Sequence, residues 1–245
     1  MDRANQRSSD PALIWLRPER ARQQSRPSLS REEITRAAVH LADTKGLESV
    51  TIRRLASVLG AGANSLYWYI ASKDDLFELM ADEVIGEIEL PDPPSAGWRT
   101  DLRTIAHNTH HVFRRHGWIV LLGIQPGLGP KTRRYGHVAM TALAGLGLDA
   151  ATQINVLATL NNFLFGFAHR ESAWKQLHKR AGLTERQWHA RLEQLLEESR
   201  QEDPELAEYI DTRLSIHDQE SFEFGLTCLL DGFAALASGR HLPTS

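Results

Sequence analysis

Adjacent side chains in the segment ANSLYW are of the types that read DNA. Asn64 can bind adenine through two hydrogen bonds, and Ser65 can bond to a base edge or to a phosphate. The rings of Tyr67 and Trp68 offer apolar contact to thymine methyl groups, and the Tyr67 hydroxyl can reach a phosphate. A helix beginning at Ala63 would present all four from its first two turns, the part of a recognition helix that enters a major groove.

The residues before this segment indicate the first helix and the turn of a helix-turn-helix. Ala56 is small enough to lie where two helices cross, and Gly60, four residues later, can adopt the positive φ of the turn. Leu55, Leu66 and Tyr69 are among the residues that would form the core between the two helices. A helical hairpin that serves packing alone is the alternative interpretation, because these constraints on side-chain size are loose.

Three flanking residues and the charge distribution favour DNA binding over packing alone. Thr51 at a helix start and Arg53 just inside it can hold the DNA backbone or reach a guanine. Lys73 opens the next helix, where its charge and the helix N-terminus both favour phosphate. Residues 1–73 contain 12 Lys and Arg against 7 Asp and Glu, a net +5, so the rest of this chain of net charge −3 carries −8. The basic first part is therefore expected to meet a polyanion.

The elements that must position these residues are helices. The sequence SREE at Ser30 is a capping box, which predicts a first helix that ends at Gly46. Two short helices are expected over 51–59 and 63–69, and a longer helix begins after Ser72.

Changes in composition divide the chain into three parts. Residues 1–28 are rich in Arg and Pro and are expected to form a largely flexible basic arm. Residues 29–90 would form the helix-turn-helix DNA-binding domain. The segment PDPPSAG, which no helix tolerates, then marks the boundary to a second domain over residues 91–245.

The second domain reads as helix almost throughout. Residues 150–172 are apolar nearly all round, which is typical of a helix in the centre of a bundle. Residues 184–215 are acidic with a helical pattern broken near Asp203–Pro204, and residues 218–238 form a last apolar helix. No alternating strand pattern competes anywhere, so the predicted fold class is all-α.

Composition excludes several other classes of protein. The 245 residues, with 42% hydrophobic and 24% charged side chains, match an ordinary globular protein with a sizeable core. A single cysteine, Cys228, excludes a disulfide framework and a Cys-based zinc module. No run approaches the ~18 apolar residues of a membrane span, and the residues MDRANQRSSD have no apolar core following a basic tip. We therefore expect no membrane partner and a cytoplasmic location.

The stretch over roughly residues 30–90 closely resembles the DNA-binding region of tetracycline-repressor (TetR) family regulators. The resemblance rests on ITRAAVHLADTKGLESV, TIRRLASVLGAGANSLYWYI and SKDDLFELM, and the ending FEFGLTCLLDGFAAL is similar to the last helix of the tetracycline-repressor subgroup. By position, it implies a DNA interface made of Thr51, Arg53, Ala63, Asn64, Ser65, Tyr67, Trp68 and Lys73. Ala63 stands where family members often carry a polar base reader. The resemblance also implies a homodimer that binds a double-stranded DNA operator and a small-molecule inducer; no cofactor is expected.

Two further sets of candidate residues lie in the second domain. A stripe of small residues on the last helix would let another helix approach closely, either the partner's last helix or the central helix of the same chain. The dimer candidates are Gly225, Cys228, Leu229, Gly232, Ala235 and Leu236. Pockets combine apolar walls with a few polar groups, and the inducer candidates are Trp98, His110, Phe113, Trp118, Asn161, Phe165 and His169. Asn161 lies on an apolar stripe, where an unpaired amide would cost about 1–3 kcal/mol, so we expect a ligand, a backbone carbonyl or a water as its partner.

These observations lead to two hypotheses of different classes. The first is a sequence-specific transcriptional regulator without enzymatic activity, a homodimeric repressor released from a palindromic operator by an inducer; an activator would share this architecture. The alternative is a helical-bundle ligand-binding protein or enzyme without operator binding, although the sequence lacks a nucleophile elbow, a phosphate-binding glycine loop and paired Glu-x-x-His motifs. His107 and His111 have an i, i+4 spacing that can ligate zinc, but no HExxH carboxylate accompanies them, and no metal site is expected.

Overall fold

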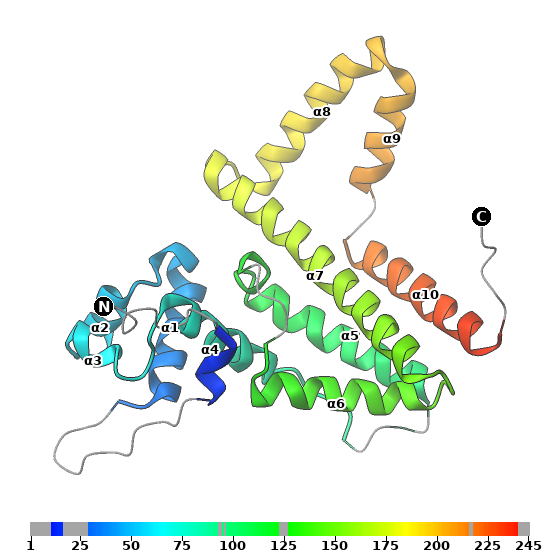
Figure 1. Cartoon of the computed structure of the whole chain (residues 1–245). Coiled ribbons are helices and arrows are strands. Elements are labelled where there is room, and N and C mark those ends of the chain that lie inside the picture. Colours follow the sequence, from blue (N-terminus) through cyan, green and yellow to red (C-terminus); the bar gives the residue numbers. More distant parts are fainter. Residues whose placement is uncertain are drawn as a thin grey trace, which may run out of the picture. The chain divides into compact units, whose positions relative to one another are not determined.

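The computed structural model describes residues 11–16, 29–92, 95, 97–122, 127–215 and 218–239. Within these residues every regular element is a helix, which confirms the predicted all-α class (Figure 1). The chain forms two compact units, Met1–Gly145 and Leu146–Ser245.

The first unit begins with the four helices expected from the sequence. They are α1 (Arg31–Lys45), α2 (Ile52–Val58), α3 (Ala63–Leu66) and α4 (Lys73–Ile85), with a short 3₁₀ helix, η2 (Leu47–Ser49), after α1. The Ser30 hydroxyl accepts from the Glu33 amide at 3.0 Å, and the Glu33 carboxylate accepts from the Ser30 amide at 2.8 Å. Both halves of the predicted capping box are therefore present, and Gly46 follows the last residue of α1 as predicted.

The core of these four helices consists of aliphatic side chains that the helical period places on their inner faces. Ile34 of α1, Leu55 of α2, Leu66 of α3 and Leu76 of α4 are all fully buried. Helix α1 contacts both α2 and α4, and α2 contacts α3. Burial of one side of such short helices is what holds them, since helices of this length are marginal alone.

A short 3₁₀ helix, η1 (Pro11–Leu16), contacts α4. Ile14 is fully buried, and the indole N–H of Trp15 donates to a Glu78 carboxylate oxygen at 3.0 Å. The sequence predicts a largely flexible basic arm over residues 1–28, but its residues 11–16 form a helix that contacts α4. The physical reason is the burial of Ile14 and the hydrogen bond of Trp15 to Glu78; the other residues of the arm lie outside the described residues.

The first unit continues beyond the boundary predicted at residue 91. Helices α5 (Trp98–Arg115) and α6 (Pro130–Ala144), with the 3₁₀ helix η3 (Ile119–Leu121) between them, complete it. Asp82 of α4 accepts from the Thr132 amide at 2.8 Å and from the Thr132 hydroxyl at 2.9 Å, at the first turn of α6. A buried carboxylate thus satisfies free N–H groups at a helix start and ties α6 to α4.

The described residues of the second unit fold into four helices. They are α7 (Ala150–Ala181), α8 (Glu185–Glu202), α9 (Pro204–Ser215) and α10 (Asp218–Ala237). The predicted break near Asp203–Pro204 is confirmed, because α8 and α9 pack as a hairpin and the Asp203 side chain accepts from the Leu206 amide at 3.0 Å. Helix α7 extends nine residues beyond the apolar stretch 150–172. Between α7 and α10, Phe163 and Phe222 stack with ring centroids 5.5 Å apart.

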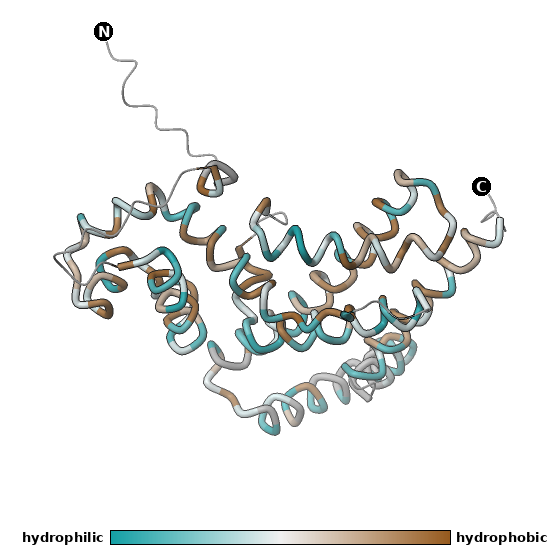
Figure 2. The backbone as a smooth tube through the Cα atoms, turned by 90° about the horizontal axis from the view of Figure 1, so that it is seen from below, coloured by the Kyte–Doolittle hydropathy of each residue, from teal (hydrophilic) through white to brown (hydrophobic). Residues whose placement is uncertain are grey.

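Apolar and polar residues alternate along the helices, as the brown and teal segments of Figure 2 show. This pattern is typical of helices that bury one face and expose the other. Among the described helices, none is both long enough and apolar enough to cross a bilayer.

Candidate nucleic-acid interface

Helices α2 and α3 meet in the predicted helix-turn-helix geometry. Gly60 has φ +62°, in the left-handed region that the turn requires and that glycine adopts without strain. The Ala61 amide donates to the Ala56 carbonyl at 2.9 Å, which closes the turn, and Ala56 is buried with 4% of its surface exposed. The small side chain at position 56 and the glycine at position 60 therefore serve the roles predicted for them.

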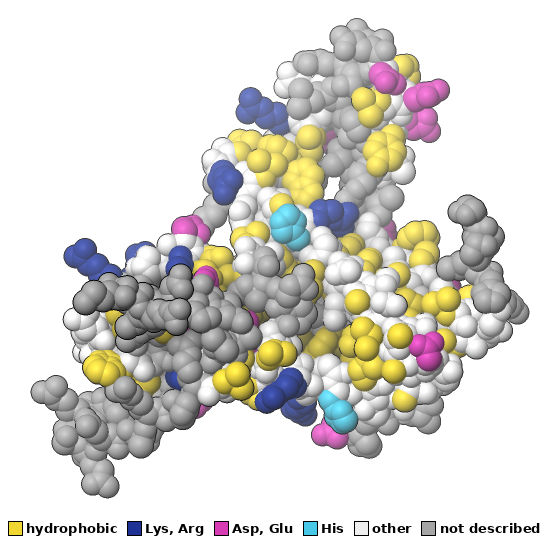
Figure 3. Space-filling model, in the orientation of Figure 1, with side chains coloured by type: hydrophobic (Ala, Val, Ile, Leu, Met, Phe, Trp, Pro, Cys, Tyr) yellow, Lys and Arg dark blue, Asp and Glu magenta, His cyan; other side chains and the backbone are white. Residues whose placement is uncertain are grey.

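The residues predicted to read bases lie on the outside of this unit. Asn64 and Ser65 are exposed, and Tyr67 and Trp68 have 52% and 63% of their surface exposed despite their large apolar rings. Apolar and basic side chains reach the surface over the helices α2 and α3 (Figure 3). Two neighbouring exposed aromatic rings give this surface an apolar character.

The recognition helix is shorter than the predicted span of 63–69. Regular α-helix covers only Ala63–Leu66, and the chain continues in hydrogen-bonded turns in which the Trp68 amide donates to Ser65 and the Tyr69 and Ile70 amides donate to Leu66. Tyr67 and Trp68 therefore lie on the turn that follows α3.

The flanking candidates Thr51, Arg53, Ala63 and Lys73 are all exposed. The Thr51 hydroxyl caps α2 by accepting from the Arg54 amide at 3.2 Å, while Arg53 projects into solvent from the first turn of that helix. Lys73 is the first residue of α4, and its ammonium lies 4.9 Å from the centre of the Phe77 ring, a cation–π contact that orients it. Ala63 is exposed at the start of α3.

Two residues that the sequence interpretation missed hold the end of this surface. The Nε of Arg31 donates to the Tyr69 carbonyl at 3.2 Å, and a carboxylate oxygen of Asp75 accepts from the Ala71 amide at 2.8 Å. The capping sequence SKDD at Ser72 was a signal for Asp75, since a carboxylate at that spacing reaches back past the helix start. Nothing in the local sequence pointed to the Arg31 contact, which spans 38 positions.

A polar cluster joins α1 to the ends of α4 and α5. His116, which follows α5 and is buried, has its Nδ1 2.8 Å from Asp43 and its Nε2 2.9 Å from Glu87. The indole N–H of Trp118 also donates to Asp43, at 2.6 Å, and Arg115 forms an ion pair with Glu87 at 2.8 Å. Trp118, an inducer candidate, therefore uses its only polar atom within this cluster.

The other inducer candidates are divided between the two units. In the first unit, His110 and Phe113 are buried on α5 and Trp98 is partly exposed. In the second unit, Asn161 and Phe165 are partly exposed on α7 and His169 is exposed.

Helix α6 buries the phenol of Tyr135. Burial raises the pKa of Tyr135 on α6 to about 12. The neighbouring Thr109 side chain acts in the opposite direction and lowers the pKa of the phenol. The phenol therefore stays neutral at physiological pH and remains a donor as well as an acceptor.

The dimer candidates on α10 do not all face the same way. A Cβ atom at Gly225 would come within 2.5 Å of the Phe163 ring of α7, so this glycine permits close packing inside the chain. A Cβ atom at Gly232 would meet no atom within 4 Å, and Cys228 and Leu236 are exposed. Leu229 and Ala235 are partly exposed.

The described residues contain no group of three or more His, Cys, Asp or Glu side chains placed to hold a metal ion. His111 is exposed and His107 is partly exposed on α5.

Comparison with known proteins gives the same assignment as the exposed helix-turn-helix. Residues 34–80 match the family model described as bacterial regulatory proteins of the tetR family, and residues 90–237 match the model described as tetracyclin repressor-like, C-terminal domain. The chain belongs to the TetR family. It is a helix-turn-helix transcriptional regulator, as the sequence predicted.

The similarity of this TetR-family chain to individual relatives extends over most of its length. It is 31% identical over 235 residues, 94% of this chain and 86% of the relative, to the HTH-type transcriptional repressor DrrR1 of Streptomyces coeruleorubidus. It is 33% identical over 166 residues, 67% of this chain and 70% of the relative, to an HTH-type transcriptional regulator of Saccharopolyspora erythraea. The solved structure of ActR from Streptomyces coelicolor in complex with actinorhodin has a TM-score of 0.74 at 24% identity, over 88% of this chain and all of ActR.

Proposed function

We propose that this TetR-family chain is a homodimeric repressor that leaves a palindromic operator when a small molecule binds its second domain, residues 91–245. The observation that carries the proposal is the exposure of Asn64, Ser65, Tyr67 and Trp68 on a buried, braced scaffold of helices. These side chains match the donor, acceptor and methyl groups of a major groove. The relative DrrR1 is named a repressor, which supports repression over activation.

A dimer is supported by the outward face of α10. Phe224 has 74% of its surface exposed and Cys228, one turn later, is also exposed, while Phe222, Leu226 and Leu230 are buried on the opposite side. The helix thus buries one apolar face within the chain and exposes a phenylalanine on the other. This arrangement favours pairing of α10 with the same helix of another copy around a two-fold axis. Two recognition helices about one DNA turn (~34 Å) apart then bind two half-sites together, which gives a short helix useful affinity.

The link from an inducer to DNA runs through α4 in this proposal. That helix contacts α1, η1, α5 and α6, so a shift of α5 or α6 on inducer binding moves the helix that follows the recognition helix. An inducer acts only by the difference in its affinity for the two arrangements, and DNA must favour the other one. The complex of ActR with actinorhodin supports a small organic molecule as the class of inducer.

The experiment is a selection of bound sequences from a random DNA pool by the full-length protein, followed by a screen of small molecules for release. The proposal expects an enriched palindrome and a compound that lowers affinity for it. Retention of the pool without enrichment would overturn operator binding and favour a ligand-binding protein of the same fold. Enrichment of a single, unpaired half-site would overturn the dimer.

A further inference from the structure

The recognition helix is too short to hold its own direction. Regular α-helix covers only the four residues Ala63–Leu66, and a helix of one turn gains too few hydrogen bonds to offset the cost of its nucleation. Contacts with other helices must therefore fix its direction. Leu66 and Ile70, both fully buried, provide two apolar anchors on its inner side.

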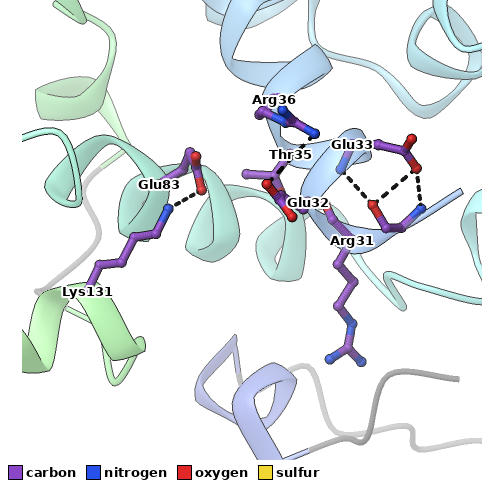
Figure 4. Close-up of polar contacts among 8 residues, drawn as sticks. Arg31, Glu32, Glu33, Thr35, Arg36, Glu83 and Lys131 are labelled. Atoms are coloured by element: carbon purple, nitrogen blue, oxygen red, sulfur yellow. Dashed lines mark hydrogen bonds and ion pairs between the residues drawn. The ribbon is translucent and has the colours of Figure 1, made fainter. Parts of the chain in front are cut away.

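The polar anchor from α1 is Arg31. Its Nε donates to the Tyr69 carbonyl at 3.2 Å, just after the exposed rings of Tyr67 and Trp68. Arg31 is the first residue of α1, where the Ser30–Glu33 capping box holds the backbone. In Figure 4 the Arg31 side chain points away from the neighbouring Arg36–Glu32 pair on the same helix.

The anchor from α4 is Asp75. It is 2% exposed, accepts from the Ala71 amide at 2.8 Å, and donates its own amide to the Ser72 hydroxyl at 3.0 Å. Residues 69 and 71 are thus bound from two different helices, one through a carbonyl and the other through an amide. Hydrogen bonds that involve a charged group are stronger than those between neutral groups, so both anchors resist displacement.

We propose that Arg31 is a positioning residue for base recognition, which acts through the Tyr69 carbonyl and not through a DNA phosphate. The inference rests on the proposed function and identifies which buried contact its specificity depends on. Loss of this contact frees the end of the recognition segment, and the base-reading side chains then lose their alignment. Contacts to the DNA backbone do not need that alignment, so non-specific binding is retained.

The test compares Arg31→Met with Arg36→Met in the full-length protein. Both variants remove one positive charge from α1 and keep an apolar stem, and Arg36 is an exposed residue whose partner Glu32 lies 3.7 Å away on the same helix. Affinity is measured against the selected operator and against a random duplex of equal length, each over a range of salt concentrations. We expect Arg31→Met to lower operator affinity about tenfold, the effect of one charge-assisted hydrogen bond, with unchanged random-duplex affinity and salt slope.

Two outcomes with DNA would overturn the proposal. Unchanged operator affinity in Arg31→Met would show that the contact does not position the helix. An equal loss on both duplexes, with a salt slope lower by about one per subunit, would identify Arg31 as a phosphate contact. A wild-type protein with no preference for any sequence would refute the proposed function instead, and this result is distinct from either.

A readout without DNA tests the same contact. Amide hydrogen exchange over residues 63–71 is expected to accelerate in Arg31→Met and not in Arg36→Met, because the end of the segment opens locally. The variant Asp75→Asn, which weakens the anchor from α4, is expected to give the same pattern with an unchanged helical circular dichroism signal. Equal exchange in all of these proteins would contradict the positioning role.

Discussion

The Nδ1 of His116 lies 2.8 Å from a carboxylate oxygen of Asp43, and this contact joins the end of α5 to α1. The other ring nitrogen lies 2.9 Å from Glu87, just beyond α4. One buried imidazole ring therefore connects three helices of the first unit.

Replacing His116 by Gln is expected to destabilise the first unit. A glutamine side chain cannot contact both carboxylates along the two directions of the ring, and the lost contacts are worth about 1–2 kcal/mol. Chemical denaturation measures this loss. The control is His111→Gln, an exposed position on α5 that should leave the unfolding free energy unchanged. Equal stability of both variants would contradict the connecting role of His116.

Tyr135 predicts a loss of stability at alkaline pH. Burial raises the pKa of its phenol from 10.0 to about 12, so the folded state holds this proton more tightly than the unfolded state. The contribution is complete below pH 10 and is lost as the pH rises from 10 to 12, by roughly 1.4 kcal/mol per pH unit. The unfolding free energy of wild type minus that of Tyr135→Phe should fall over this range. A constant difference would refute the raised pKa.

Arg53→Ala and Tyr67→Ala should each weaken operator binding without unfolding the dimer. Both side chains are exposed, so their loss removes a DNA contact worth about 1–3 kcal/mol and little else. A mobility-shift titration measures the effect, and size-exclusion chromatography checks the assembly. Normal operator affinity in either variant would remove that residue from the interface.

Lys73→Ala should weaken binding to all DNA sequences by a similar factor. Its ammonium opens α4 and is placed for a phosphate, which carries no sequence information. The slope of log affinity against log salt should fall by about one per subunit. If the loss of affinity is confined to the operator, Lys73 reads a base itself or positions another residue that reads a base.

Two glycines on α10 separate packing within the chain from packing between copies. Gly225→Ala places a methyl group against the Phe163 ring and should destabilise each protomer. Gly232→Ala meets no atom within 4 Å inside the chain, so it should act only through a partner helix and raise the dimer dissociation constant. Analytical ultracentrifugation with thermal unfolding distinguishes the two effects. An unchanged dimer in Gly232→Ala would place the interface elsewhere.

Local signals in the sequence were sufficient for the helices and for the outward-facing residues. Capping at Ser30 and Ser72, the turn at Gly60 and the period of the apolar residues depend on neighbours within a few positions, and the structure confirms them. The residues that brace the recognition segment were not predictable in this way. The contact of Arg31 with Tyr69 and that of His116 with Asp43 join positions 38 and 73 apart, and no local pattern encodes such a pairing.

The local sequence also could not predict which helix packs against the small residues of α10. A small side chain favours close approach of another helix but does not identify that helix. For Gly225 the neighbour is α7 of the same chain, which only the three-dimensional arrangement reveals.

Glu78 and Asp82 lie one turn apart on α4, and both are buried. Trp15, upstream of the DNA-binding domain, donates to the first, and Thr132, downstream of it, donates to the second. A chimeric regulator built by exchanging residues 29–90 alone would strand both carboxylates without their donors. The transferable module of this protein is therefore larger than the part that faces DNA, and a graft has to carry Pro11–Leu16 and the first turn of α6 with it.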